Sequence, residues 1–197
     1  MERRPGAAGV TGRRAEATLR GSIVLLRLAT SGDIAALVPI RAHPAVRRWW
    51  RGGADLEGAI AEDLAEPGST AYVIEHEGRV VGWIQWSAED EPDYRFATLD
   101  LYLDPSLHGR GIGADAVATV VGHLIAEHGH RRFEIDPAVA NLAAIACYAK
   151  VGFRPVGIRR RSERGEDGTW HDVLLMDLLA EEAGGVALSS GPRDREA

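Results

Sequence analysis

The sequence predicts one mixed α/β domain, and three observations support this fold class. A length of 197 residues suits a single domain, and 45% hydrophobic with 26% charged residues is ordinary for a globular protein. Strand-like and helix-like segments follow one another as strand, helices, three strands, helix, strand, helix and two strands. This order is typical of a mixed sheet and differs from a repeated strand–helix–strand series. A glycine-rich turn joins the strand in the middle of this order to the helix after it.

Short apolar runs predict the strands, because hydrophobic residues that alternate or continue over four to eight positions suit a half-buried or buried strand. The runs lie at 22–28, 71–76, 79–86, 96–103, 132–136, 153–159 and 170–178. Glu77-Gly78 forms a hairpin turn between the second and third strands, and an acidic loop at 89–93 follows the third. A polar turn at 163–168 joins the last two strands.

Helices are predicted where apolar residues recur with helical spacing between capping and breaking residues. They lie at 34–41, 55–66, 113–127 and 141–150, with a short turn at 45–50. Ser31-Gly32-Asp33 begins the first helix and His43-Pro44 ends it, whereas Pro67-Gly68 ends the second. Gly152 caps the last helix at its C-terminal end.

The two ends of the chain differ in composition from its middle. Residues 1–21 lack periodicity and 181–197 are rich in small and polar residues, so we expect a flexible leader, a domain at 22–180 and a flexible tail. No apolar run is long enough to span a bilayer, and no secretion signal follows the arginines of the leader. The cytoplasm is the expected compartment, without membrane association.

Charge and metal-ligating residues exclude several classes of function. A net charge of −6 argues against general nucleic-acid binding. The single cysteine, Cys147, excludes disulfides and cysteine metal sites within one chain. His123, His128 and His130 match no zinc spacing, so we expect them at the surface near a helix end and expect no metal site.

The glycine-rich turn is the segment Leu107-His108-Gly109-Arg110-Gly111-Ile112-Gly113. Glycines allow the backbone to turn tightly and to bring N–H groups close to a ligand. The helix that follows adds unpaired N–H groups and the positive end of its dipole. The pattern therefore predicts a site for a phosphate or pyrophosphate group.

Other interpretations of this turn are weaker. No Lys-Ser or Lys-Thr follows it, as a P-loop would require. A dinucleotide fingerprint would place Ala114 at its third glycine position, and the turn lies past the middle of the chain instead of near the start of a repeated series. A turn that binds nothing is the remaining alternative.

Two motifs in the expected order resemble the GNAT N-acetyltransferase superfamily. Leu103-Asp104-Pro105 with the glycine-rich turn is similar to its acetyl-CoA signature, and Asn141, Ala144, Tyr148, Gly152 and Phe153 match its second signature. The resemblance covers about residues 22–179 and implies a mixed, mostly antiparallel twisted sheet with flanking helices. It implies an enzyme that uses acetyl-CoA. His108 departs from the Arg or Gln that is frequent there, but a backbone cradle does not depend on that side chain.

The resemblance also implies which residues bind the cofactor. They are Leu101, Leu103, His108, Gly109, Arg110, Gly111, Ile112, Gly113, Ala114 and Asn141. In this family Asn141 would contact the pantetheine arm, and Tyr148 would lie near the sulfur as the general acid. Asn141 and Tyr148 are seven residues apart, which predicts one shared helix face. A tyrosine at such a position otherwise belongs to the core.

Asp100 is the predicted catalytic base. Strand alternation places Leu99, Leu101 and Leu103 on the core face, and Thr98, Asp100 and Tyr102 on the other. An unpaired charge is unfavourable in a central strand, so Asp100 should face a cleft or a cation. It could bind the acceptor ammonium and take its proton directly or through water; a structural ion pair is the alternative.

Within the superfamily, the chain resembles bacterial aminoglycoside 6′-N-acetyltransferases, which are enzymes of antibiotic resistance. Trp49-Trp50, Leu99-Asp100, Asp136-Pro137 and the helix from Asn141 carry this resemblance. We therefore expect Trp49, Trp50, Asp100 and Asp136 to bind a small cationic acceptor, with the acidic loop attracting it. The tryptophans could equally attach the first helices to the sheet, Asp136 could cap a turn, and an acidic loop is often only solvated.

Three alternatives stay open from the sequence. Cys147 is a rival nucleophile, although it lies about 100° around the helix from Tyr148 and no activating base is evident; direct transfer in a ternary complex is favoured. The acceptor could instead be a protein N-terminus, a lysine or a polyamine. A non-catalytic acyl-CoA-binding module would keep the glycine-rich turn without Asp100 and Tyr148. The oligomeric state is not determined, and a homodimer is compatible with the sequence.

Overall fold

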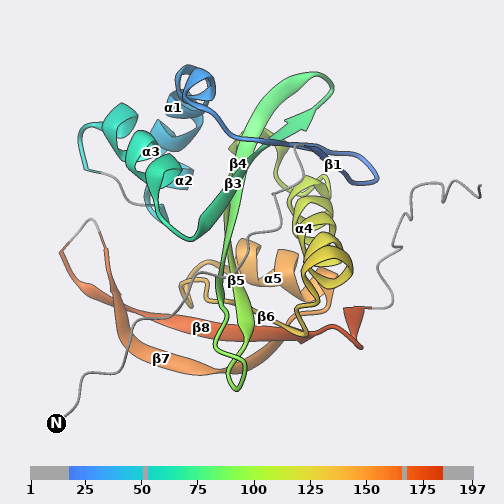
Figure 1. Cartoon of the computed structure of the whole chain (residues 1–197). Coiled ribbons are helices and arrows are strands. Elements are labelled where there is room, and N and C mark those ends of the chain that lie inside the picture. Colours follow the sequence, from blue (N-terminus) through green and yellow to red (C-terminus); the bar gives the residue numbers. More distant parts are fainter. Residues whose placement is uncertain (1–17, 51–52, 166–167, 184–197) are drawn as a thin grey trace, which may run out of the picture.

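The computed structural model describes residues 18–50, 53–165 and 168–183, which form one sheet with helices on both of its faces (Figure 1). The strands are β1 (Thr18–Arg20), β2 (Leu25–Leu28), β3 (Ser69–His76), β4 (Arg79–Glu89), β5 (Phe96–Leu103), β6 (Arg132–Ile135), β7 (Arg154–Arg164) and β8 (Trp170–Leu179). The helices are η1 (Ser31–Asp33), α1 (Ile34–Ala42), α2 (Pro44–Arg47), α3 (Leu56–Ala65), η2 (Pro105–Leu107), α4 (Ile112–His128) and α5 (Leu142–Val151).

The eight strands lie in the order β1-β2-β3-β4-β5-β6-β8-β7, and all neighbours are antiparallel except β5 and β6. The predicted mixed, mostly antiparallel sheet is therefore confirmed. The predicted strands and helices also lie where the sequence places them, with bounds that differ by a few residues.

The structure corrects both predicted ends of the domain. Thr18–Arg20, expected in the leader, pairs with β2 as strand β1, and Leu19 is buried. At the other end Ala183 is buried and Glu182 pairs with Arg154 at 2.8 Å, although the predicted tail begins at 181. A three-residue strand is too short to show an alternating pattern, which is why the sequence does not reveal it. The rest of the predicted leader and tail, 1–17 and 184–197, lies outside the described residues.

The predicted first strand is shorter than expected because the chain turns at its start to bind α4. Asp115, in the first turn of α4, accepts backbone N–H bonds from Ser22, Ile23 and Val24 at 3.0, 2.8 and 3.0 Å. Gly21 permits this approach, because a Cβ there would lie 2.5 Å from Asp115 Oδ2. One carboxylate thus holds the β1–β2 turn against the N-terminal end of α4, where negative charge is also favoured by the helix dipole.

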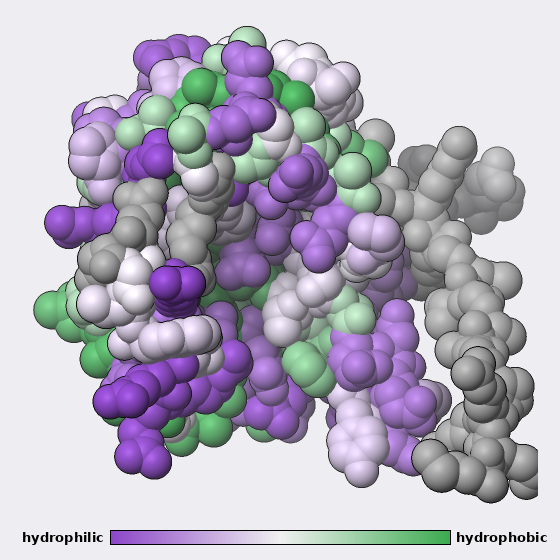
Figure 2. All heavy atoms as spheres, turned by 90° about the vertical axis from the view of Figure 1, so that its left-hand side faces the viewer, coloured by the Kyte–Doolittle hydropathy of each residue, from purple (hydrophilic) through white to green (hydrophobic). Residues whose placement is uncertain are grey.

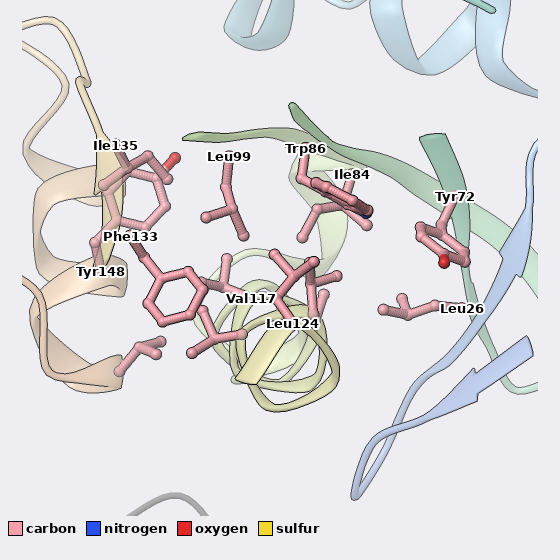
Figure 3. Close-up of a cluster of buried hydrophobic side chains, with 14 of the residues drawn as sticks. Leu26, Tyr72, Ile84, Trp86, Leu99, Val117, Leu124, Phe133, Ile135 and Tyr148 are labelled. Atoms are coloured by element: carbon pink, nitrogen blue, oxygen red, sulfur yellow. The ribbon is translucent and has the colours of Figure 1, made fainter. Parts of the chain in front are cut away.

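The sheet separates two groups of buried side chains. On one face, side chains of the sheet pack against α4; Figure 3 shows Leu26, Tyr72, Ile84, Trp86 and Leu99 on the sheet side and Val117 and Leu124 on the helix. On the other face, α1 and α3 cover Val73, Trp83 and Tyr102. The alternation predicted for β5 is therefore confirmed, since Leu99 and Tyr102 belong to opposite groups. Among the helices of the described segments, none is long and apolar enough to cross a membrane.

The histidines near the end of α4 are not all surface residues, and that prediction is wrong for His130. His130 is only 2% exposed, and His123 and His128 are half-buried. The rings of His128 and Trp86 lie 5.1 Å apart in an edge-on contact. Burial lowers the pKa of His130, and the positive charge of Arg95 lowers it further. This end of α4 is packed against β4, which the local sequence does not indicate.

Strands β5 and β6 diverge after a short stretch of pairing. They pair only at Ala97↔Phe133 and Thr98↔Glu134, whereas β5 continues to Leu103 and stays paired with β4 along its length. The second half of β5 therefore has a neighbouring strand on one side and a gap on the other. The gap opens toward the N-terminal ends of α4 and α5, whose residues line it together with β5.

The diverging half of β5 directs backbone groups into this gap. The Asp104 N–H donates to the Val81 carbonyl at 2.8 Å across the β4–β5 pair, so this opposed pair is a hydrogen-bonded one. Such pairs alternate with non-hydrogen-bonded pairs along an antiparallel ladder. Asp100 thus directs its N–H and C=O to β4, whereas Leu101 and Leu103 direct theirs away from β4. The gap is consequently bounded by an open strand edge that another extended group can pair with.

Candidate active site

A cavity of about 900 Å³ occupies the gap and extends under the first helices. Its lining comes from α1 to α3, β5, the N-terminal end of α4, the loop after β6, α5 and β7. Figure 2 views the molecule from the side on which α1 to α3 face the β7–β8 hairpin, and hydrophilic side chains gather around the recess between them. Segments distant in sequence therefore meet at one site.

The N-terminal end of α4 forms the predicted anion cradle. Gly109 and Gly111 have φ values of 79° and 86°, a left-handed conformation that favours glycine, and open space surrounds both. The first hydrogen bond of the helix joins the Asp115 N–H to the Gly111 carbonyl at 2.9 Å. The N–H groups of residues 112–114 consequently have no acceptor within the helix, and they lie at the positive end of its dipole. This is the arrangement that binds phosphate groups at helix N-termini.

Most of the predicted cofactor residues lie around this cradle. Those that line the cavity are Leu101, Leu103, His108, Gly109, Gly111, Ile112, Gly113, Ala114 and Asn141. Arg110 is exposed and does not line it. The His108 ring donates from Nε2 to the Leu103 carbonyl at 3.2 Å. His108 therefore fastens the turn to the end of β5, and the cradle itself is made by the backbone.

Asn141 lies immediately before α5 as its N-cap. Its Oδ1 accepts the Ala144 N–H at 3.2 Å, and its φ and ψ of −87° and 66° are not helical. The helix begins one residue later than predicted, and the Asn141 carbonyl accepts the N–H of Ile145 at 3.1 Å. Asn141 and Tyr148 both line the cavity. The capping bond uses the amide oxygen of Asn141, and its NH₂ group can donate to a ligand.

Asp100 lines the cavity from the middle of β5, as the sequence predicts for an acid that needs a cleft or a partner. Solvent reaches its carboxylate through the cavity, but the surrounding protein displaces much of the water around it. This desolvation, followed by the negative charge of Asp136, raises the pKa of Asp100 from 3.8 to about 6. A hydrogen bond from Gln85 acts in the opposite direction. Such a carboxylate is mostly ionised at neutral pH and is a stronger base than an ordinary aspartate.

Three more carboxylates surround Asp100, and each raises its pKa through its negative charge. They are Asp63 of α3, Asp136 of the loop after β6, and Glu163 of β7. Asp63 binds the buried Arg41 at 2.6 Å, and Asp136 binds Arg159 at 3.1 Å. Asp136 was predicted at the site, whereas Asp63 and Glu163 were not, because they come from segments that only the fold brings together.

A family model described as the acetyltransferase (GNAT) family matches residues 19–153. The chain belongs to the GNAT acetyltransferase family. The aminoglycoside N(6′)-acetyltransferase type 1 of Klebsiella pneumoniae is 29% identical over 153 residues, which is 68% of this chain and 75% of the relative.

Two solved structures illustrate the likeness in fold. RimJ of Mycobacterium smegmatis in complex with CoA-disulfide has a TM-score of 0.74 and 26% identity, over 84% of this chain and 87% of that one. The aminoglycoside acetyltransferase AAC(6′)-Ib in complex with coenzyme A has a TM-score of 0.67 and 24% identity, over 82% and 98%.

This GNAT chain is an N-acetyltransferase that uses acetyl-CoA, and its cavity fits that cofactor. The cradle at Gly109 and Gly111 has room for a pyrophosphate, because no atom lies within 4 Å of where a Cβ would be. The N–H and C=O of Leu101 face the gap, where they can pair with amide groups of an extended arm. When bound, acetyl-CoA supplies an acetyl group activated as a thioester.

Tyr148 and Cys147 both line the cavity of this GNAT enzyme from α5. Tyr148 is 6% exposed, and its ring packs against Phe153; Figure 3 places it beside Phe133 and Ile135. Burial, followed by nearby negative charge, raises the pKa of the Tyr148 hydroxyl, which keeps its proton available. Burial also raises the pKa of the Cys147 thiol. A thiol that keeps its proton is a poor nucleophile, which favours direct transfer over a covalent route through Cys147.

Trp49 and Trp50 both line the cavity, and Trp50 also packs against the helix-covered face of the sheet. The Trp50 ring meets the edge of Tyr102 at 4.9 Å, and the Arg41 guanidinium lies 5.9 Å from the Trp50 ring centre. Arg48 lies over the Trp49 ring at 5.5 Å. Trp50 therefore packs against the sheet, as one interpretation expects, and it also lines the cavity; that the pair binds the acceptor stays a prediction.

The acidic loop does not reach the site. None of its residues, 89–93, lines the cavity among the described residues. The loop lies beside the C-terminal end of α4 instead: Asp90 pairs with Arg95 at 3.2 Å, and Arg95 donates to the His128 carbonyl at 2.7 Å. The prediction that this loop attracts the acceptor is not supported by its position.

The raised pKa of Asp100 predicts that this residue destabilises the fold. The folded protein disfavours the ionised carboxylate, so stability is lost as the pH rises from about 4 to about 6. Asp100→Asn keeps the oxygen that accepts from Gln85 and removes the charge. We expect the melting temperature at pH 8 to rise by roughly 2–4 °C, a modest gain because solvent reaches the side chain.

Thermal unfolding from pH 4 to pH 8 measures this effect. The difference between Asp100→Asn and the parent should shrink as the pH falls through 6 and vanish near 4. An equal difference at every pH would contradict the assigned cause.

Proposed function

We propose that this enzyme acetylates a primary amine of an aminoglycoside, at the 6′ position, as an enzyme of the antibiotic-resistance type. The observation that carries the proposal is the set of carboxylates around Asp100 in the acceptor half of the cavity, from α3, β5, the loop after β6 and β7. Several carboxylates beside flat aromatic walls suit a ligand with several ammonium groups on sugar rings. The 29% identity to an aminoglycoside N(6′)-acetyltransferase supports the same class of acceptor.

In this proposal Asp100 binds the acceptor ammonium and takes its proton. An amine attacks a thioester only through its free electron pair, so the N–H bond must break and its electrons must stay on nitrogen. Asp100 is accessible in the cavity, and the pKa of about 6 makes it a stronger base than an ordinary aspartate. The proton moves to the carboxylate directly or through one water molecule.

Tyr148 acts in the second half of the reaction. When the acetyl group leaves sulfur, the thiolate is stabilised by a proton, and the Tyr148 hydroxyl is a donor in the same cavity. Its raised pKa keeps it protonated before transfer. Residues 112–114 and Leu101 hold the cofactor through backbone groups, and the NH₂ of Asn141 can donate to its extended arm.

The test is a thiol-release assay with acetyl-CoA and three acceptor panels: aminoglycosides, simple polyamines, and peptides with free N-termini or lysines. We expect release with aminoglycosides, and a collapse of turnover in Asp100→Asn with little change in acetyl-CoA affinity. Release with peptides alone would replace this acceptor class by a protein substrate. Release with no amine at all would favour a non-catalytic acyl-CoA-binding module, and near-normal turnover in Asp100→Asn would remove Asp100 as the base.

The ion pair between Asp136 and Arg159 leads to a second prediction about the acceptor. A second ammonium group of the acceptor must compete with the Arg159 guanidinium for the Asp136 carboxylate, 3.1 Å away. We expect Asp136→Asn to raise KM for acceptors with several ammonium groups by about 10-fold, because the variant loses one hydrogen bond to a charged group. Arg159→Gln should lower the same KM, because it removes the competitor.

Steady-state kinetics with a monoamine and an aminoglycoside in parallel check this competition. KM for acetyl-CoA serves as the control and should stay constant in both variants. If Arg159→Gln raised the acceptor KM as much as Asp136→Asn, the pair would be a unit that the acceptor does not displace.

A further inference from the structure

We propose that Trp83 and Gln85 of β4 are positioning residues that orient the Asp100 carboxylate and direct its incoming proton to the oxygen that faces the acceptor. The proposal rests on the proposed role of Asp100 as the base. It adds to that role two residues that neither the motifs nor the resemblance identifies.

Trp83 fixes the orientation of the Gln85 amide. The two residues are two positions apart on β4 and so lie on the same face of the sheet. Trp83 Nε1 donates to Gln85 Oε1 at 3.0 Å. An indole N–H can only donate, so the partner atom must be the amide oxygen, and the NH₂ group points the other way.

The Trp83 indole is itself held rigidly. It is 1% exposed and lies under α1 and α3 in the group of buried side chains on that face. Its ring is parallel to that of Tyr102, with an interplanar angle of 2° and 6.4 Å between centroids. A side chain in this position cannot change rotamer without disturbing the packing of the first helices.

Gln85 stands directly opposite Asp100 in the β4–β5 register, so the two side chains lie on the same face of the sheet, and hydrogen bonding from Gln85 lowers the pKa of Asp100. The pair is a hydrogen-bonded one, so the two backbones approach each other through the ladder as well. Because the Gln85 oxygen is already bonded to Trp83, only N–H groups face Asp100. In the proposed arrangement the NH₂ group of Gln85 binds one carboxylate oxygen of Asp100 and leaves the other for the cavity.

This arrangement determines where the proton goes. When the acceptor N–H bond breaks and its electron pair stays on nitrogen, a new O–H bond forms on Asp100. The oxygen bound by Gln85 continues to accept that hydrogen bond, so the proton settles on the oxygen directed to the acceptor. A carboxylate that could rotate freely would lose part of this selection and of the geometric precision that catalysis requires.

Titratable and charged groups around Asp100 also influence its pKa, and their effect must be separated from that of Gln85. These groups are Asp63 of α3, Arg41 of α1, Asp136 of the loop after β6, Tyr148 of α5, and Arg159 and Glu163 of β7. None of these residues is itself altered when Gln85 is replaced. A shift in the pH profile of such a variant therefore reports the lost hydrogen bond.

The experiment compares Gln85→Met and Trp83→Phe with the parent in profiles of kcat/KM against pH. Methionine keeps the length of glutamine and removes its donors, so the ionised form of Asp100 loses a hydrogen bond. We expect the acidic limb of the profile to move up by about one pH unit in Gln85→Met. In Trp83→Phe the amide is still present but free to turn, so the limb should move in the same direction by less.

Trp86→Phe is the matched control. Trp86 is also a buried tryptophan of β4, but it faces α4 on the opposite side of the sheet, and within the described part of the chain its Nε1 has no hydrogen-bond partner. We expect the acidic limb of the Trp86→Phe profile to lie at the same pH as in the parent. Melting temperature and acetyl-CoA affinity, measured on each variant, separate a loss of fold from a loss of positioning.

Asp100→Asn distinguishes this proposal from the one on which it rests. Suppose that Asp100→Asn is nearly inactive, while Gln85→Met keeps the parental kcat and an acidic limb at the parental pH. Asp100 is then the base, but Gln85 does not position it. If Asp100→Asn keeps its turnover, the proposed base itself is wrong. Should Trp83→Phe fail to fold, Gln85→Met alone decides the question.

Discussion

The divergence of β5 from β6 is the constraint on which the rest of the site depends. Two pairs of residues join the strands, and beyond them β5 is held by β4 alone. The gap exposes the backbone of Leu101 and Leu103, places the N-terminal end of α4 beside that open edge, and brings Asp100 to a cavity in place of a closed sheet. A strand paired along the second half of β5 would occupy this gap and cover the N–H and C=O groups of Leu101 and Leu103.

A carboxylate in the middle of a central strand is unfavourable unless something compensates it. Within the described segments no arginine forms an ion pair with Asp100, although Arg41 and Arg159 bind its neighbours Asp63 and Asp136. Asp100 is left with a neutral donor, Gln85, and with a raised pKa. The environment of Asp100 therefore lowers the stability of the folded protein and makes Asp100 a stronger base. Active sites commonly combine these two effects.

The features that could be predicted from the sequence depend only on residues close together in the chain. Gly109 and Gly111 need left-handed backbone, Gly152 ends a helix, and the alternation along β5 separates Leu99 from Tyr102, so these features are visible in short windows. The element order and the site residues of the glycine-rich turn follow from the same signals. They locate a cofactor cradle and a candidate base before any tertiary contact is known.

Features set by tertiary contacts could not be predicted. The pairing of Gln85 with Asp100 depends on the register across the long β4–β5 loop, which no turn motif defines. The burial of His130 depends on packing against β4, and Asn141 is an N-cap because the helix starts one residue later than its spacing suggests. The carboxylates Asp63 and Glu163 reach the site from helix α3 and strand β7, far apart in the chain.

The central claim is that the open half-strand of β5 holds the cofactor, and amide hydrogen exchange tests it most directly. Exchange at single residues is measured with and without saturating acetyl-CoA. Slower exchange on binding is expected at Leu101 and at residues 112–114, with no change at Asp100, whose N–H already faces β4. Unchanged exchange at Leu101 in the fully bound protein would contradict the claim that the diverging strand edge is the cofactor's partner.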